Sequence, residues 1–322
     1  MKVAIRGGGV AGSLLGHLLK NSNHEVTIFD IKKSYIKPCG DIVPNLYRPP
    51  MSWDVQYEIK RFAFLVDGEL IYDVEYRRPK WLVIDKWSWI NGMRESIQHK
   101  VTLNPPDLRE FDLVVDSRGP YPMDRKVVYT TRAIIKTENF NDTAVFEFSS
   151  KYTGFYWIFP SKEGEYNVGA GFLEYKNSRE LLMDYMNSKM GKFKLIDIRG
   201  APISVERPKE KGNRIGEARG LVFPLSGEGI RPSAISAEET FQAITKNKEI
   251  SSYLDDRIKT MESRIKIQSI LLNAYMRAKP SMRKVMTKTL MRNDVLIDAY
   301  LEDKLDLQGI SESLRLMKSG GI

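Results

Sequence analysis

The chain has 322 residues but only one cysteine, Cys39. A single cysteine excludes an intramolecular disulfide, and the strand-like segment KVAIR directly after Met1 leaves no room for a signal or transit peptide. We therefore expect a cytoplasmic protein. No apolar run reaches the roughly 18 residues that a membrane-spanning helix needs. A peripheral position at the inner face of a membrane stays open.

Histidine is scarce as well, and His17, His24 and His99 are scattered along the chain, so we expect no metal site. The sequence also lacks zinc-ligand spacing, a helix-turn-helix pattern and an aromatic RNA-binding motif, so no nucleic-acid partner is expected. Lys and Arg nevertheless outnumber Asp and Glu by 50 to 41, which gives a formal net charge of +9. This excess favours an anionic partner, such as phospholipid headgroups or a phosphorylated small molecule.

Strand and helix patterns alternate in a way that is typical of the α/β class. Residues 2–30 predict a βαβ unit, with a strand in KVAIR, a glycine turn in GGGVAG, a helix in SLLGHLLK and a second strand in EVTIFD. Buried strands are also predicted in WLVID, which a helix to about residue 98 follows, and in FDLVVD at 111–116. Alternating apolar residues around an Asp67-Gly68 turn predict a β-hairpin over residues 59–76, in which Phe62, Phe64 and Val66 match Leu70, Tyr72 and Val74.

The second half of the chain changes from strands to helices. Residues 126–206 predict strands interrupted by one helix near 178–190, with Ser178 as its N-cap. RIGEARGLVFP predicts a further strand and turn, GEGIRPSAISAEETFQAI opens a helix, and the pattern is helical from 250 to the end. We therefore predict an FAD-binding domain from residues 1–50, 81–125 and 207–250, a sheet substrate domain from 51–80 and 126–206, and a helical segment from 251–322.

A GxGxxG turn lies between the first strand and the first helix, formed by Gly7, Gly9 and Gly12, and Asp30 ends the second strand. The glycines suit a tight turn, close approach of the backbone to a diphosphate, and close packing of helix on strand, while the acid suits a ribose hydroxyl. This context predicts dinucleotide binding. Asp30 in place of an arginine disfavours a ribose 2′-phosphate, and the chain has no second GxGxxG for a separate NADPH domain.

Three segments, KPCGD at 37–41, GFYWIFPSKEGEYNVGAG and GEARGLVFPLSGEGI, resemble the geranylgeranyl reductase family over residues 1 to about 250. The family's YxWxFP motif is similar to the segment Phe155–Pro160, and the following GxG is similar to Gly169 and Gly171. Phe155 replaces the family's tyrosine, next to Tyr156. The resemblance implies a Rossmann-like FAD-binding domain of the hydroxybenzoate-hydroxylase type with an inserted antiparallel sheet, and reduction of isoprenoid double bonds.

The resemblance also implies which residues bind FAD and substrate. Glu217 in GEARG stands for the acid of the family's GDAAG motif, Lys86 for a basic residue after a strand, and Val101 for a backbone contact to adenine. Phe155, Tyr156 and Trp157 would contact the prenyl substrate. The complete set of implied cofactor contacts is Gly7, Gly9, Val10, Ala11, Gly12, Asp30, Cys39, Gly40, Lys86, Val101, Asp116, Glu217, Gly227, Gly229 and Ile230.

Cys39 lies between Pro38 and Gly40, in a loop just beyond the ribose-binding acid. Proline and glycine mark loops, and this loop can follow the cofactor. The family keeps a Cys-Gly pair here, which implies that Cys39 is the catalytic residue. A thiol with an ordinary pKa of about 8.5 is mostly protonated at neutral pH and can supply or relay the proton that alkene reduction needs. A small buried hydrophobic residue is the alternative interpretation.

Each functional interpretation has a structural alternative. GFYWIFP can be an amphipathic core strand, Asp116 can cap its own turn, and Glu217 can be a surface carboxylate. The whole chain can instead be a flavin monooxygenase or halogenase of the same fold, or a non-catalytic flavin or lipid carrier. For a reductase, we expect a prenyl lipid or prenyl diphosphate as substrate and an external electron donor, either a ferredoxin-like protein or NAD(P)H.

Residues 263–293 contain eight basic residues and no acidic one. Pro280 can start a helix in which Met282, Val285, Met286 and Leu290 recur at helical spacing, with several cations on the other side. Two interpretations stay open: the apolar side faces the core and the basic side is solvated, or the basic surface, including Arg283, Lys284 and Lys288, docks on anionic lipid.

Overall fold

The first βαβ unit is present as predicted. The computed structural model describes residues 1–35, 37–102, 107–138, 141–162 and 164–306. Strand β1 pairs in parallel with β2, and the four-stranded parallel sheet has the order β8-β2-β1-β9. Its elements are β1 (Lys2–Arg6), α1 (Val10–Leu19), β2 (Glu25–Asp30), β8 (Gln98–Val101) and β9 (Leu113–Asp116).

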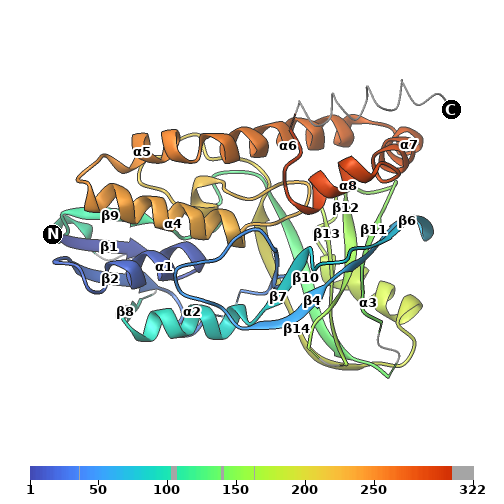
Figure 1. The fold of residues 1–322 in the computed structure, drawn as a ribbon, viewed down its shortest axis with the longest axis horizontal. Helices are drawn as coiled ribbons and strands as arrows, with labels where there is room; N and C mark the ends of the chain where they lie inside the picture. The colour runs from blue at the N-terminus through green and yellow to red at the C-terminus, as the bar shows by residue number, and fades with distance from the viewer. Residues whose placement is uncertain (36, 103–106, 139–140, 163, 307–322) are drawn as a thin grey trace.

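Helices cover this parallel sheet at one end of the elongated molecule (Figure 1). Helix α1 packs against both α2 (Lys86–Glu95) and α4 (Ile230–Thr245), and α5 (Ile250–Arg257) packs on α4. Leu14 and Leu15 of α1 are fully buried in this core. The predicted helix in GEGIRPSAISAEETFQAI is confirmed as α4.

A seven-stranded sheet occupies the other half of the molecule, with the order β14-β10-β13-β12-β11-β5-β6. Its neighbouring strands are antiparallel, except that β11 pairs with β5 in parallel. The strands are β5 (Arg61–Val66), β6 (Glu69–Glu75), β10 (Val127–Lys136), β11 (Thr143–Phe148), β12 (Gly154–Pro160), β13 (Glu165–Phe172) and β14 (Lys194–Ser204).

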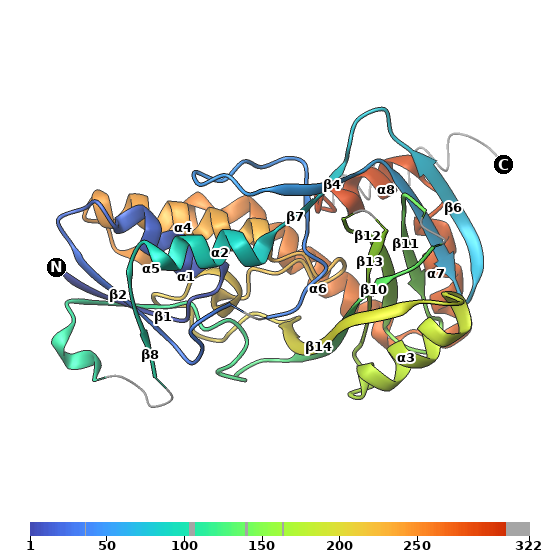
Figure 2. The same ribbon diagram turned by 90° about the horizontal axis from the view of Figure 1, so that it is seen from below.

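The two faces of this sheet carry different helices, which Figure 2 shows on different sides of the strands. One face packs with α3 (Ser178–Lys189), whose Leu182 and Met186 are fully buried. The other face packs with α8 (Asp294–Leu301) and is rich in aromatic rings. A smaller three-stranded sheet has the order β3-β7-β4 and is formed by β3 (Ile42–Pro44), β7 (Trp81–Ile84) and β4 (Val55–Ile59).

Three local predictions need correction. The hairpin β5–β6 has its turn at Asp67-Gly68, but a bulge after Phe64 places Leu65, not Val66, opposite Leu70. Asn177 is the N-cap of α3, and Ser178 is instead the first helical residue, where its hydroxyl pairs with that of Thr131 at 2.8 Å. The strand predicted in RIGEARGLVFP is reduced to a single bridge at Arg214, because the glycines that follow adopt positive φ and close a 3₁₀ turn (η2, Gly216–Arg219).

The helical pattern after residue 250 is confirmed as far as the structure describes it, and residues 307–322 lie outside the described residues. Helices α6 (Lys259–Arg277) and α7 (Pro280–Leu290) lead to α8. Within the described residues, no helix is both long and apolar enough to cross a membrane. The predicted domain boundaries stay a prediction.

Candidate active site

The three glycines of the GxGxxG turn have three different structural reasons. Gly7 has φ +98°, and a side chain there would meet the carbonyl oxygen of Ser117 at 2.6 Å. A side chain on Gly9 would meet no atom within 4 Å, because this position faces open space at the start of α1. A side chain on Gly12 would overlap the carbonyl oxygen of Gly7 and the hydroxyl of Ser117. The turn therefore combines a positive-φ bend, an open approach to a helix N-terminus, and close packing.

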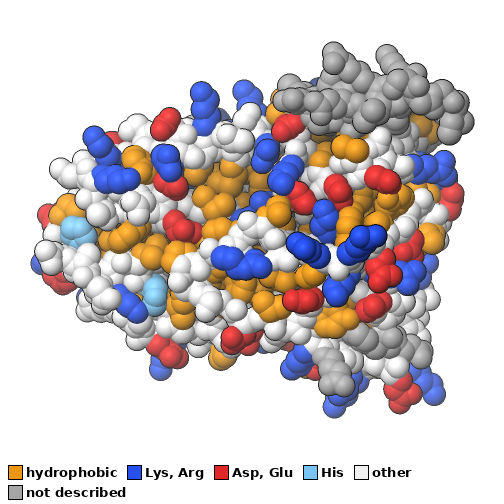
Figure 3. Space-filling view, in the orientation of Figure 1, with side chains coloured by type: hydrophobic (Ala, Val, Ile, Leu, Met, Phe, Trp, Pro, Cys, Tyr) orange, Lys and Arg blue, Asp and Glu red, His pale blue; other side chains and the backbone are white. Residues whose placement is uncertain are grey.

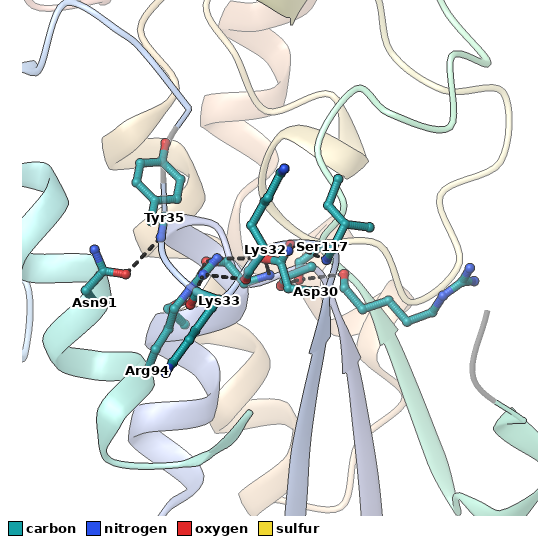
Figure 4. A network of polar contacts seen from close by, with 12 residues as sticks. Asp30, Lys32, Lys33, Tyr35, Asn91, Arg94 and Ser117 are labelled. Atoms are coloured by element: carbon teal, nitrogen blue, oxygen red, sulfur yellow. Dashed lines mark hydrogen bonds and ion pairs between the residues drawn. The ribbon is translucent and has the colours of Figure 1, made fainter. Parts of the chain in front are cut away.

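Asp30 and Arg94 hold this turn in place, as the dashed contacts in Figure 4 show. The Asp30 carboxylate accepts hydrogen bonds from the backbone N–H of Gly8 at 2.7 Å and from Nη2 of Arg94 at 2.6 Å. The buried guanidinium of Arg94 also donates to the carbonyl oxygens of Gly8, Lys32 and Lys33. Burial lowers the pKa of Arg94, while Asp30 opposes that shift.

A cavity of about 630 Å³ opens in front of this turn. Both sheets contribute to its wall, because Arg199, Gly200 and Ile203 of β14 face the residues of the GxGxxG turn across it. Cations outnumber carboxylates among its lining residues, which suits an anionic ligand. The cations are Arg6, Lys32, Lys37, Lys86, Arg94, Arg118 and Arg199, and the carboxylates are Asp30 and Glu217.

Most of the residues that the sequence assigned to a cofactor meet in this cavity. The predicted residues that line it are Gly7, Gly9, Val10, Ala11, Asp30, Cys39, Lys86, Glu217, Gly227, Gly229 and Ile230. Those that are not among the lining residues are Gly12, Gly40, Val101, Asp116, Phe155, Tyr156 and Trp157.

The four exceptions among the predicted cofactor contacts have separate causes. Gly12 is a packing position, and Gly40 lies against the ring of Phe159, which a side chain on Gly40 would meet at 3.2 Å. Val101 ends β8, and the next residue, Thr102, lines the cavity instead. These positions are not among the lining residues of the cavity, and their contact with a cofactor stays a prediction.

Asp116 caps its own turn, as the structural alternative predicts. Its carboxylate accepts from the backbone N–H of Arg118 at 3.2 Å and forms an ion pair with the guanidinium at 2.7 Å. Burial would raise the pKa of Asp116, but these bonds outweigh it and the pKa is lowered. Arg118 lines the cavity, so Asp116 orients one of the cations in the cavity wall.

Glu217 also lines the cavity and lies in the 3₁₀ turn η2. Its carboxylate forms an ion pair with Nζ of Lys37 at 2.6 Å and accepts from the backbone N–H of Ser204 at 2.9 Å. The residue therefore joins the KPCGD loop to the end of β14, and it is not a free surface carboxylate. Nearby, Gly229 is the N-cap of α4, so a second helix N-terminus reaches the same cavity.

Cys39 is part-exposed at the wall of the cavity and has charged neighbours. Nζ of Lys86 lies 2.9 Å from Oδ1 of Asp41 and also hydrogen-bonds the thiol, and the backbone N–H of Asp41 donates to Sγ at 3.2 Å. Burial by the surrounding protein raises the pKa of Cys39 although Lys86 opposes it. Burial would lower the pKa of Lys86, but Asp41, Cys39 and Tyr35 together raise it well above its ordinary value. At neutral pH the thiol is therefore protonated beside an ammonium group.

The aromatic motif is linked to the cysteine through one buried amide. Nε1 of Trp157 on β12 donates to Oδ1 of Asn167 on β13 at 3.0 Å, and Nδ2 of Asn167 donates to the carbonyl oxygen of Cys39 at 2.9 Å. Trp157 also lies directly over Gly169, its partner on β13, where any side chain would overlap the indole. This contact explains why the tryptophan and the glycine occur at a fixed spacing.

The structure does not bring the three predicted substrate contacts to one place. Phe155 and Trp157 belong to the aromatic layer beneath α8, with their ring centroids 6.2 Å apart. Tyr156 points to the opposite face of the sheet and stacks on Tyr185 at 4.1 Å, because successive strand residues alternate in direction. Tyr156 thus packs under α3, away from Phe155 and Trp157, and the three substrate contacts stay a prediction.

Two buried acidic residues, Glu228 and Asp303, lie near the start of α4. Glu228 lies between the cavity-lining Gly227 and Gly229, and Arg231 contacts both its carboxylate and that of Asp303, at 3.5 and 3.3 Å. Ser226 donates to Asp303 at 2.6 Å. Burial raises the pKa of Glu228 although Arg231 opposes it, and burial together with Glu228 raises the pKa of Asp303 well above its usual value.

Sequence reasoning missed Arg94, Asn167 and Asp303. Arg94 stands near the end of a helix and Asp303 follows one, so neither carries a motif signal. Asn167 does occur in the NVGAG segment, two residues before Gly169. A buried asparagine on a predicted core strand needs hydrogen-bond partners, and that requirement is the signal that could have found it.

Comparison with known proteins agrees with this geometry. No family model matches the chain. A stretch of 106 residues is 33% identical to digeranylgeranylglycerophospholipid reductase 2 of Methanothermobacter thermautotrophicus, covering 30% of this chain and 28% of that protein's length. A geranylgeranyl bacteriochlorophyll reductase-like protein from Thermoplasma acidophilum superposes with a TM-score of 0.75 over 99% of this chain and 98% of its own, at 15% identity.

The predicted resemblance to the geranylgeranyl reductases is thus confirmed. Two further solved structures have a similar fold. A mutant of the halogenase PltM in complex with FAD has a TM-score of 0.64 at 11% identity, covering 99% of this chain and 84% of the halogenase. A mutant of 2-methyl-3-hydroxypyridine-5-carboxylic acid oxygenase has a TM-score of 0.61 at 12% identity, over 94% and 96% of the two chains. These similarities confirm the predicted fold class.

Proposed function

We propose that the protein binds FAD in the 630 Å³ cavity and saturates C=C double bonds of geranylgeranyl chains in lipids or prenyl diphosphates. The observation that carries the proposal is the position of Cys39: a protonated thiol in the cavity wall, tied through Asn167 to the tryptophan of the aromatic motif. The partial match to a digeranylgeranylglycerophospholipid reductase supports the same substrate class.

The residues present fit an adenine dinucleotide. The open position at Gly9 leaves room for a diphosphate at the N-terminus of α1, and the N-terminus of α4 faces the same space. Arg94 orients Asp30, whose carboxylate would accept a hydrogen bond from a ribose hydroxyl. The excess of lining cations would offset the two negative charges of the diphosphate.

Reduction of an isolated alkene needs a hydride at one carbon and a proton at the other. Reduced FAD, when bound, supplies the hydride. Cys39 would give its Sγ proton to the second carbon, and the thiolate left behind would be stabilised by the ammonium group of Lys86 until a proton returns from solvent. A ferredoxin-like protein or NAD(P)H would reduce the flavin again.

The first experiment is anaerobic photoreduction of the purified protein, followed by mass spectrometry of added detergent-solubilised geranylgeranyl lipids. We expect yellow protein with bound FAD and products heavier by two mass units for each bond reduced. Protein that cannot be reconstituted with FAD would overturn the proposal. Bound FAD without turnover would instead favour the carrier alternative. In a parallel aerobic assay with NAD(P)H, consumption of oxygen and NAD(P)H without alkene reduction would favour the monooxygenase or halogenase, whose fold this chain shares.

Substitution of the cysteine tests its role directly. Cys39→Ala should retain FAD and lose about 10²–10⁴-fold in alkene reduction, the range typical of a positioned proton donor. Cys39→Ser separates the possible roles, because nearly normal turnover in that variant would assign Cys39 to the shape of the pocket. Undiminished turnover in Cys39→Ala would leave the thiol as a packing group only.

A further inference from the structure

Helix α7 has its apolar side towards solvent, the reverse of an ordinary surface helix. Met282 and Val285 are 55% and 58% exposed, Leu290 at the end of the helix is exposed as well, and Met286 is half-buried. The residues buried under α7 are polar, namely Arg283 and Thr287. A helix on a folded domain normally buries its apolar stripe. We call the side formed by Met282, Val285, Met286 and Leu290 the outer face of α7.

The inward direction of the polar side has a clear cause. Arg283 donates to the carbonyl oxygens of Met276 at 2.6 Å and Ala278 at 3.0 Å, at the end of α6, and it approaches Glu174 at 3.3 Å. Carbonyl groups at a helix C-terminus lack partners within the helix, so an inward arginine satisfies them. This capping fixes the rotation of α7 and leaves its apolar residues outside.

The cations predicted to bind lipid therefore need correction. Arg283 is buried, and Lys288 pairs with Glu69 at 2.7 Å, with Lys284 3.9 Å from the same carboxylate. The expectation that the apolar side faces the core is wrong too, because that side is exposed. Neither of the two predicted arrangements of α7 is the one observed.

Other cations flank the outer face. Arg277 precedes α7, Lys279 is its N-cap and Arg292 follows it; all three are exposed, and none has an ion-pair partner among the described residues. Two acidic residues nearby already have partners. Glu69 forms ion pairs with Lys284 and Lys288, and Asp294 accepts a hydrogen bond from the hydroxyl of Tyr72. On the face of the molecule seen in Figure 3, basic and acidic side chains are otherwise intermixed.

We infer that the outer face of α7 inserts into the interfacial layer of a membrane that contains anionic lipid. An apolar stripe bordered by unpaired Lys and Arg is the pattern of helices that lie in the headgroup region. Large exposed apolar surfaces on single-chain proteins mark interaction sites. The inference deepens the proposed function, on which it rests, since a prenyl lipid substrate resides in such a membrane.

A layer of packed aromatic rings lies between the end of α7 and the candidate site. Figures 1 and 2 place α7 at the far end of the molecule from the parallel sheet. From Met291, directly after α7, one aromatic layer runs back towards the cavity. Its ring centroids lie 5.9 Å apart between Tyr300 and Phe146 and 5.2 Å between Phe146 and Phe159, which touches Gly40 beside the cysteine.

The test is co-sedimentation of the full chain with vesicles of neutral phosphatidylcholine, with and without about one third phosphatidylglycerol, at low and high salt. We expect binding to the anionic vesicles that weakens as salt rises. Val285→Glu should weaken it by about tenfold or more, and Lys279→Gln by about fivefold. The control is Trp87→Glu on α2, where the side chain is similarly exposed at 56% and binding should be unchanged.

A fluorophore on Val285→Cys distinguishes other occupants of the outer face. A blue shift only on addition of vesicles supports the inference. A blue shift without vesicles that depends on protein concentration would assign the outer face to a second copy of the chain. A blue shift without vesicles that is independent of concentration would assign the outer face to the chain's own remaining segments. Either result would overturn the inference. Equal vesicle binding by Val285→Glu and Trp87→Glu would also overturn the inference. Turnover is measured on detergent-solubilised lipid, so this inference and the proposed function can fail separately.

Discussion

Helices α1 and α7 show how differently two amphipathic segments can be used. Helix α1 buries seven of its ten residues between a sheet and two neighbouring helices, and its N-terminus faces the cavity. Helix α7 buries two residues, both polar, and exposes its apolar stripe. Similar apolar spacing thus predicts a helix in both places, but what covers the stripe depends on the elements that surround it.

The glycine turn before α1 should give the largest effect. Gly12→Val should prevent folding, because the side chain would overlap the backbone of Gly7 and the hydroxyl of Ser117. Gly9→Val should fold normally and lose flavin, because its side chain meets no protein atom within 4 Å and occupies the space in front of the helix. Circular dichroism and flavin absorbance measure the two outcomes. Flavin retained by folded Gly9→Val would contradict the assigned position of the diphosphate.

Arg94 tests how strongly the turn depends on its buried ion pair. Arg94→Leu leaves the Asp30 carboxylate without its main partner, so the free energy of unfolding should fall by about 3–5 kcal/mol. Arg109→Leu removes an arginine that is also paired with an aspartate but whose side chain is 88% exposed, and it should change the free energy of unfolding far less than Arg94→Leu. Urea unfolding measures both. Equal losses would show that burial of Arg94 does not set the strength of its contacts.

A matched pair of truncations tests the contrast between the helices themselves. Leu14→Ala in α1 removes a fully buried side chain and should lower the free energy of unfolding by about 2–5 kcal/mol. Val285→Ala in α7 should change it by no more than about 0.5 kcal/mol, because that side chain already faces solvent. Thermal unfolding without lipid measures both. A large loss in Val285→Ala would mean that the outer face is covered in solution.

The acidic pair near α4 should make stability depend on pH. Burial and Glu228 raise the pKa of Asp303, so the folded protein holds a proton that the unfolded chain releases near pH ~4. This contribution to stability is complete below that pH and is lost as pH rises through the folded-state pKa. The Asp303→Asn side chain cannot ionise, so this variant should lose less stability than the wild type as the pH rises above the unfolded-state pKa.

The control for this smallest effect is Asp107→Asn. Hydrogen bonds from Arg109 lower the pKa of the exposed Asp107, so that carboxylate is ionised in both states over the same pH range. Its substitution should leave the pH profile unchanged. Denaturant unfolding at several pH values gives the comparison. A wild-type profile that does not fall towards high pH would contradict a raised pKa for Asp303.

Some of the site could be predicted because local chemistry requires it. A positive φ or a close backbone approach demands glycine, so Gly7 and Gly12 were visible in the sequence with their structural reasons. The fixed distance between Trp157 and Gly169 was visible too, and it reflects one cross-strand contact. Arg94 and Asp303 were not visible, because their partners are distant in the chain. Asp30 lies 64 residues from Arg94, and Arg231 and Ser226 lie 72 and 77 residues from Asp303.

The sequence by itself determined the βαβ unit, the turn of the hairpin at Asp67-Gly68, and the presence of a cysteine in a loop beyond Asp30, because periodicity and turn chemistry act over a few residues. Only the tertiary structure decided that Tyr156 packs under α3, that Asn167 joins Trp157 to Cys39, and which way α7 faces. Rotation of a helix and satisfaction of a buried polar group depend on contacts between distant segments, and these exist only once the chain has folded.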